Sequence, residues 1–197
     1  MTSFIHERMR LCFVHVPKTG GHTITRFFAR DRKRVWRNDF STLNERLPIH
    51  ASFKDMHDRL GDALFGYFSF AFYRNSWDYL YSVYRYVCRT PLHPRYAQLS
   101  SMSFEDFVLY ESQNFYRPQM PLVTMAGRRS VTRLDDFRNF ESAFREILYD
   151  LGYNSIEISQ HNVSPDGKDY RQVYTKEMMK KVGDVYEEDI EFFKFKF

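Results

Sequence analysis

The sequence has few cysteines, no long apolar run and little excess charge, and each of these features excludes a class of protein. Cys12 and Cys88 are its two cysteines, and they form neither a disulfide framework nor a zinc-binding spacing, so we expect reduced thiols in or near the core. No apolar stretch approaches the roughly 20 residues of a membrane-spanning helix, and residues 1–10 are too polar for a signal peptide. We therefore expect a cytoplasmic protein with no membrane span. The net charge of +4 and the lack of interleaved basic and aromatic residues argue against nucleic acid as a partner.

The remaining composition is that of a globular protein with alternating strands and helices. Apolar residues make up 43% and aromatic residues 18% of a chain whose length suits one domain, so we predict a single domain over residues 1–197. Continuous apolar runs at residues 11–16 and 67–73 predict buried strands, and their alternation with helical patterns predicts a parallel sheet flanked by helices. The predicted helices cover residues 23–31, 53–64, 77–89, 103–112, 136–151 (capped by Asp135 or Asp136) and 175–192, and residues 120–125 and 131–134 are predicted to form a strand and its return strand.

The first strand leads directly into a segment that is suited to phosphate binding. After residues 11–16 the chain continues as a lysine-containing turn with two glycines and then as the start of a helix. Backbone N–H groups at a helix start point toward an anion, and glycine allows the backbone to approach it closely. The lysine precedes the glycines here, in contrast to GxxxxGK[ST], so the segment predicts a phosphate cradle of another kind than the standard P-loop. The candidate residues are Pro17, Lys18, Thr19, Gly20, Gly21, His22 and Thr23.

A second candidate anion site follows the second strand. Arg74 ends that strand, and Ser82 follows eight residues later, about two helical turns on. A guanidinium and a hydroxyl so placed can hold one phosphate together. The alternative interpretation is an arginine that caps carbonyl groups and a serine that bonds its own helix. Because the carboxyl ends of parallel strands meet at one sheet edge, the two sites together suit a ligand with phosphate at both ends.

These motifs resemble those of sulfotransferases that use 3′-phosphoadenosine 5′-phosphosulfate (PAPS). Residues 17–23 resemble the 5′-phosphosulfate loop of that family, and residues 73–84 resemble its 3′-phosphate motif, in which an arginine precedes a serine by eight residues. Residues 49–53 are similar to a histidine-bearing segment between the two motifs. Residues 161–164, with Tyr170, Arg171, Tyr174 and residues 186–193, are similar to a C-terminal signature. The resemblance is greatest to the carbohydrate branch, which includes heparan sulfate 2-O-sulfotransferase and short bacterial and viral relatives.

The resemblance implies a fold, a cofactor and a set of roles. The fold would be P-loop-like, with three layers and a central parallel sheet flanked by helices. Lys18 would neutralise charge on the leaving 5′-phosphate of PAPS, and Arg74 and Ser82 would hold the 3′-phosphate; the product would be PAP, and no metal would be required. His50 matches the segment where a catalytic base is expected, and His22 is the second candidate. Asn162, Ser164 and Arg171 would contact the nucleotide.

The expected reaction is in-line transfer of a sulfuryl group from PAPS to a hydroxyl acceptor, for which the carbohydrate branch implies a saccharide. A P-loop kinase for a small molecule is an alternative. It requires a metal-binding hydroxyl, which Thr19 would supply, and an aspartate at the end of a strand, and no such strand is predicted. A second alternative is a catalytically inactive nucleotide- or glycan-binding module of the same fold.

Overall fold

A computed structural model describes residues 3–30, 47–154, 157–158 and 169–197 of the chain. The chain divides into two compact units. Unit 1 comprises Met1–Tyr73 and Pro121–Val163, and unit 2 comprises Arg74–Met120 and Ser164–Phe197. The assignment of residues 1–197 to one domain stays a prediction.

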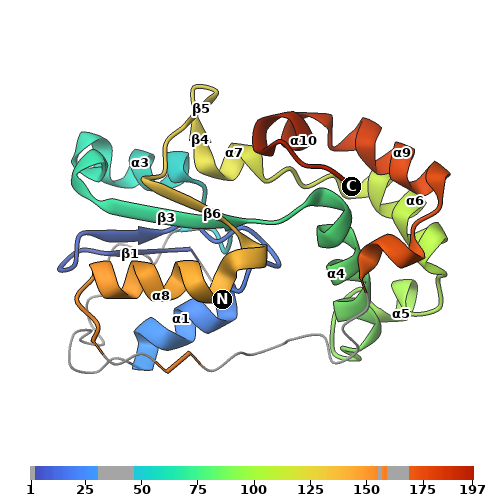
Figure 1. Cartoon of the computed structure of the whole chain (residues 1–197), viewed down its shortest axis with the longest axis horizontal. Coiled ribbons are helices and arrows are strands. Elements are labelled where there is room, and N and C mark those ends of the chain that lie inside the picture. The colour runs from blue at the N-terminus through green and yellow to red at the C-terminus, as the bar shows by residue number, and fades with distance from the viewer. Residues whose placement is uncertain (1–2, 31–46, 155–156, 159–168) are drawn as a thin grey trace. The chain divides into compact units, whose positions relative to one another are not determined.

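Unit 1 contains a sheet of four strands in the order β1-β2-β3-β6 (Figure 1). Strand β2 pairs with β3 in parallel, β3 pairs with β6 in parallel, and β1 adds an antiparallel edge to β2. The predicted α/β fold with a central, mostly parallel sheet is therefore confirmed. The strands are β1 (Phe4–His6), β2 (Leu11–Phe13), β3 (Phe68–Tyr73) and β6 (Arg133–Asp136), and a separate hairpin consists of β4 (Thr124–Met125) and β5 (Arg128–Arg129).

Helices cover both faces of this sheet, as the three-layer prediction requires. Helices α1 (Gly21–Arg30) and α8 (Phe140–Asp150) lie on one side and α3 (Phe53–Leu60) on the other (Figure 1). Alternate residues of β3 point to the same face, so Phe70 and Phe72 pack together into the α1/α8 layer. The buried core of that layer is Phe4, Leu11, Phe13, Ile24, Phe28, Phe70, Phe72, Ala143, Phe144, Ile147, Leu148 and Tyr153.

Unit 2 is helical, and α4 is its central helix. Helix α4 (Ser76–Cys88) contacts α5 (Tyr96–Leu99), α6 (Phe104–Asn114) and α9 (Lys176–Val185). Side chains that accept backbone N–H bonds begin these helices: Asn75 for α4, Ser103 for α6 and Thr175 for α9. The remaining elements of unit 2 are the 3₁₀ helix η3 (Tyr170–Val173) and α10 (Glu187–Phe193).

Several predicted boundaries differ from the structure for identifiable reasons. The helix predicted over 53–64 ends at Leu60, because Gly61 adopts φ +60° and a 3₁₀ helix, η1 (Gly61–Gly66), follows. The prediction that residues 131–134 return along 120–125 is wrong. The short helix α7 (Met120–Val123) precedes β4, the return strand is β5, and residues 133–136 join the main sheet as β6.

Two predicted helices also differ from the structure. Asp136 caps the 3₁₀ helix η2 (Phe137–Asn139), and α8 starts only after it, at Phe140. The helix predicted over 175–192 is divided at Tyr186 into α9 and α10. The second of these starts with three consecutive acidic residues, which favour a new helix N-terminus.

Candidate functional site

The segment after β2 contains two residues in a left-handed backbone conformation. Lys18 and Gly20 adopt φ +65° and +78°, both in the left-handed region. Turns with residues in this conformation direct successive backbone N–H groups toward one point, where an anion can bind. The Thr19 hydroxyl donates to the carbonyl oxygen of Val16 at 2.7 Å, and Thr19 is fully buried. The loop is therefore fastened to the segment that joins it to β2.

Both glycines of the loop lie against side chains that leave no room for a methyl group. At Gly20 a Cβ atom would lie 2.7 Å from Cε2 of Phe140, and at Gly21 it would lie 2.7 Å from Cε1 of His15 and closer still to Nε2 and Cδ2. Real Cβ atoms essentially never approach another heavy atom within 3.0 Å. Gly21 thus lets the start of α1 rest directly on the His15 ring, and Gly20 lets the loop lie against the Phe140 ring.

His15 and His50 form a pair beside the loop. Their ring centroids lie 4.6 Å apart, and His50 Nδ1 lies 3.0 Å from the His15 carbonyl oxygen. A carbonyl can only accept, so Nδ1 of His50 carries a proton, and in the neutral form of the ring the lone pair lies on Nε2. Burial, with the nearby charges of His50 and Lys18, lowers the pKa of His15 to about 3. His15 is therefore neutral at physiological pH.

The other loop candidates occupy the start of α1 or its approach. Pro17 is half-buried, His22 is the second residue of α1 and also half-buried, and Thr23 is buried one residue further on. The segment that carries His50 is held to residues that flank β1 and β2, because Ser3 donates through Oγ to the Ala51 carbonyl at 2.9 Å and accepts the backbone N–H of His15 at 2.9 Å.

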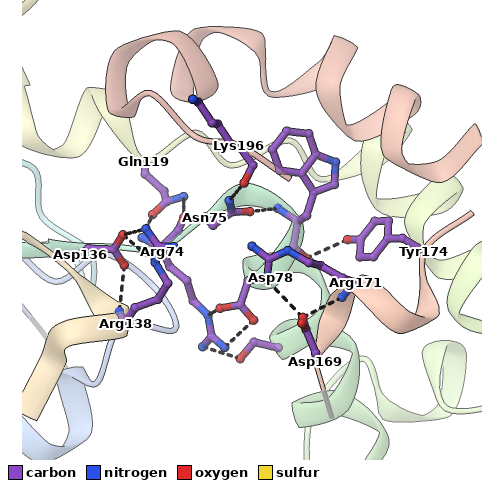
Figure 2. Close-up of polar contacts among 12 residues, drawn as sticks. Arg74, Asn75, Asp78, Gln119, Asp136, Arg138, Asp169, Arg171, Tyr174 and Lys196 are labelled. Carbon is purple, nitrogen blue, oxygen red and sulfur yellow. Dashed lines mark hydrogen bonds and ion pairs between the residues drawn. The ribbon is translucent and has the colours of Figure 1, made fainter. Parts of the chain in front are cut away.

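Arg74 and Ser82 are brought into direct contact in unit 2. Arg74 NH1 donates to Ser82 Oγ at 3.0 Å, while Nε and NH2 donate to the two carboxylate oxygens of Asp78 at 2.7 and 3.0 Å (Figure 2). The side chains of Arg74 and Asp78 are 17% and 20% exposed, so this charge-assisted fork is only partly screened by water. Asp78 thereby fixes the plane of the guanidinium, and Ser82, which accepts through its oxygen, can still donate its hydroxyl proton to an anion.

Arg171 lies on an element that packs against the first turn of α4. Tyr174, which follows η3, donates its hydroxyl to the Trp77 carbonyl at 2.8 Å (Figure 2). Arg171 is exposed, donates to Asp169 at 3.3 Å and lies over the Tyr170 ring, 4.6 Å from its centroid. Asn162 and Ser164 lie outside the described residues.

The structure also shows contacts around Arg74 that the sequence analysis missed. Asp78 stands four residues after Arg74 in the sequence, a spacing that could have identified it as the partner of the arginine. Gln119 binds the backbone of Arg74 from 45 residues away, and Asp189 binds the backbone of Gln119 from 70 residues away; no local pattern marks either residue.

The expectation that no strand ends in aspartate is wrong. Strand β6 ends with Asp135 and Asp136, but both carboxylates are bound locally, by Arg133 at 2.6 Å and by Arg138 at 2.6 Å. Within the described residues, no group of three or more histidine, cysteine, aspartate or glutamate side chains is arranged to hold a metal ion. None of the helices in the described part of the chain is both long and apolar enough to cross a membrane.

Comparison with known proteins identifies the fold. No family model matches the chain, and no curated protein matches its sequence. Among solved structures, the chain is similar to mouse sulfotransferase SULT7A1 complexed with PAP, with a TM-score of 0.57 and 12% sequence identity. The similarity covers 95% of this chain and 86% of that chain. The chain therefore has the P-loop-like α/β fold of that protein.

Proposed function

We propose that the chain is a PAPS-dependent sulfotransferase and that residues 1–197 form a single sulfotransferase domain. The observation that carries the proposal is the contact of Arg74 with Ser82, oriented by Asp78, at the start of α4. The fold shared with a PAP-complexed sulfotransferase supports it, because PAP is the nucleotide that remains when PAPS has given up its sulfuryl group. The assignment to the carbohydrate branch rests on the sequence resemblance alone.

The 3′-phosphate distinguishes PAPS from ATP and needs its own binding site. We assign this role to Arg74 and Ser82. Asp78 binds Nε and NH2 of the arginine, and NH1 donates to Ser82, so the guanidinium and the hydroxyl lie side by side. A phosphate there would receive charge-assisted hydrogen bonds from a guanidinium that is already oriented. Arg171, Asn162 and Ser164 are proposed as further nucleotide contacts.

The 5′ side of the nucleotide is assigned to the loop after β2. The left-handed residues Lys18 and Gly20 shape a backbone cradle, and Gly21 lets the helix start approach closely. Pro17, Thr19, His22 and Thr23 complete this segment. PAPS, when bound, supplies the electrophilic sulfuryl group. The Lys18 ammonium would neutralise the charge that develops on the departing phosphate, a role that does not require a metal ion.

The acceptor hydroxyl must lose its proton as it attacks, and we assign His50 as the base. Its Nδ1 proton is directed to the His15 carbonyl, which orients the ring and leaves the lone pair on Nε2 to take a proton. His22 is the second candidate, because it lies in the loop itself. The acceptor class is proposed to be a saccharide hydroxyl.

The kinase alternative conflicts with one feature of the loop. A P-loop kinase would use the Thr19 hydroxyl as a ligand for Mg²⁺. That hydroxyl is fully buried and donates to Val16 at 2.7 Å, so it serves the loop's own structure.

Calorimetry with two nucleotides that differ only in the 3′-phosphate tests the proposal. Wild-type protein should bind PAP more tightly than AMP, and Arg74→Ala should reduce PAP affinity by roughly 10- to 100-fold while AMP affinity is kept. Lys18→Ala should reduce sulfate transfer from PAPS by roughly 100-fold or more. Equal affinity of the wild type for PAP and AMP would refute the proposal. PAP binding without transfer to any of a panel of hydroxyl acceptors would favour the inactive binding module.

A further inference from the structure

The backbone of Arg74 is held by the side chain of a residue 45 positions away along the chain. Gln119 accepts the Arg74 N–H through Oε1 at 2.9 Å and donates through Nε2 to the Arg74 carbonyl at 2.6 Å (Figure 2). Arg74 lies between β3 and α4 and belongs to neither element. Its backbone is therefore not fixed by the regular hydrogen bonds of a strand or a helix. The amide of Gln119 thus supplies the two hydrogen bonds that a neighbouring strand would supply.

Gln119 is itself held from the C-terminal part of unit 2. The carboxylate of Asp189 accepts the Gln119 N–H at 3.0 and 2.8 Å and the Met120 N–H at 2.8 Å. Asp189 is 0% exposed and Gln119 is 1% exposed, so water does not compete for these bonds. Burial raises the pKa of Asp189 to about 6, which leaves the carboxylate ionised at neutral pH as a strong acceptor.

The contacts form one continuous connection to the guanidinium. It runs from the Asp189 carboxylate through the backbone and side chain of Gln119 to the backbone of Arg74, and from there to Asp78 and Ser82. Arginine has several rotatable bonds, so where its guanidinium lies depends on where its backbone is held. A rotation of the Arg74 backbone would separate NH1 from Ser82.

We propose that Gln119 and Asp189 are positioning residues for the 3′-phosphate site, holding the Arg74 backbone so that its guanidinium and Ser82 act together. This inference rests on the proposed function, because it assigns the Arg74/Ser82 pair to a phosphate. Neither residue is placed in contact with the nucleotide. Their effect is therefore confined to ligands that carry a 3′-phosphate.

The test compares PAP and AMP affinity by calorimetry in Gln119→Met and Asp189→Asn. Gln119→Met keeps the shape of the side chain but removes both hydrogen bonds to Arg74, and PAP affinity should fall about tenfold with AMP affinity unchanged. Asp189→Asn places an NH₂ group against the Gln119 N–H, and PAP affinity should fall about fivefold. Glu111→Gln is the matched control, because Glu111 is also a buried carboxylate of unit 2 but pairs with Arg95. Removing its charge should leave the ratio of PAP affinity to AMP affinity unchanged.

A second measurement does not depend on nucleotide binding. In ligand-free protein, the Nε–H resonance of Arg74, assigned with Arg74→Lys, should shift and exchange faster in Gln119→Met, because the bond to Asp78 loosens. An unchanged resonance together with an unchanged PAP/AMP ratio would overturn the inference while the proposed function stands. Equal loss of PAP and AMP affinity would also overturn the inference, because such a result would indicate general disruption of the structure of the variant. A wild type that binds PAP no better than AMP would overturn both.

Discussion

The contact of Gly21 with His15 gives the sharpest stability prediction. In Gly21→Ala the new methyl group would lie 2.7 Å from His15 Cε1 and nearer to two other ring atoms. The ring has little room to move, because it stacks on Phe13 at 5.7 Å and lies 4.6 Å from the His50 ring, and the backbone N–H of His15 is fixed by Ser3. The start of α1 must therefore shift, or the ring must leave its site.

Two effects of opposite sign decide how far Gly21→Ala changes the free energy of unfolding. Overpacking of a well-filled site costs about 1–3 kcal/mol. Alanine is favoured over glycine inside a helix by up to about 1 kcal/mol, and Gly21 is the first residue of α1, where less of that gain is realised. We expect Gly21→Ala to destabilise the protein by ~1–2 kcal/mol. Gly183→Ala is the matched control: a methyl group there would lie 3.9 Å from Trp77 Cζ2, an ordinary contact, so that variant should be more stable than wild type.

Urea denaturation measures both variants, and a double-mutant cycle isolates the contact. If the His15 ring causes the cost, Gly21→Ala should be neutral or stabilising in a His15→Ala background. Wild-type or higher stability of Gly21→Ala would refute the reasoning. If Gly21→Ala destabilised the protein equally with and without the His15 ring, the contact with that ring would not be the source of the destabilisation.

Two further predictions concern the proposed base and the buried carboxylate. His50→Asn keeps a donor for the His15 carbonyl but removes the base, so kcat should fall roughly 10²- to 10⁴-fold with PAP affinity unchanged; a loss below tenfold would exclude His50 as the base. Burial raises the pKa of Asp189 from 3.8 to about 6, so the folded protein binds the extra proton between these values. The stability that this group contributes is complete below pH 4 and is lost as the pH rises through 6, by up to about 3 kcal/mol. Denaturation at pH 4 and pH 7 should show this decrease in wild type relative to Asp189→Asn, and parallel pH dependence in the two proteins would contradict it.

Local patterns predicted the elements that carry the proposed phosphate contacts. The apolar runs that become β2 and β3 are buried on both faces of the sheet, so they read as continuous hydrophobic segments. The side chains of Asn75 and Ser103 accept backbone N–H bonds at the starts of α4 and α6, within one residue of the helix starts predicted at 77 and 103. The short edge strand Phe4–His6 could not be predicted, because three residues are too few for a periodicity.

What holds these contacts in place could not be predicted, because it depends on residues distant in sequence. Gln119 lies 45 residues from Arg74, and Asp189 lies 70 residues beyond Gln119. Nothing in the local sequence of either residue indicates that a buried amide or carboxylate will bind backbone groups elsewhere. His15 is a comparable case, since a histidine within an apolar run gives no sign that Gly21 will pack against its ring.

The contact between Gln119 and Asp189 also has a consequence for protein synthesis. The ribosome adds about 5–20 residues per second, so Asp189 is made roughly 4–14 s after Gln119, from which it is separated by 70 residues. During that interval the N–H groups of Gln119 and Met120 lack their carboxylate partner. The nascent chain can form α4 and α6 early, but the backbone around Arg74 becomes fixed only when the segment that carries α10 has been made.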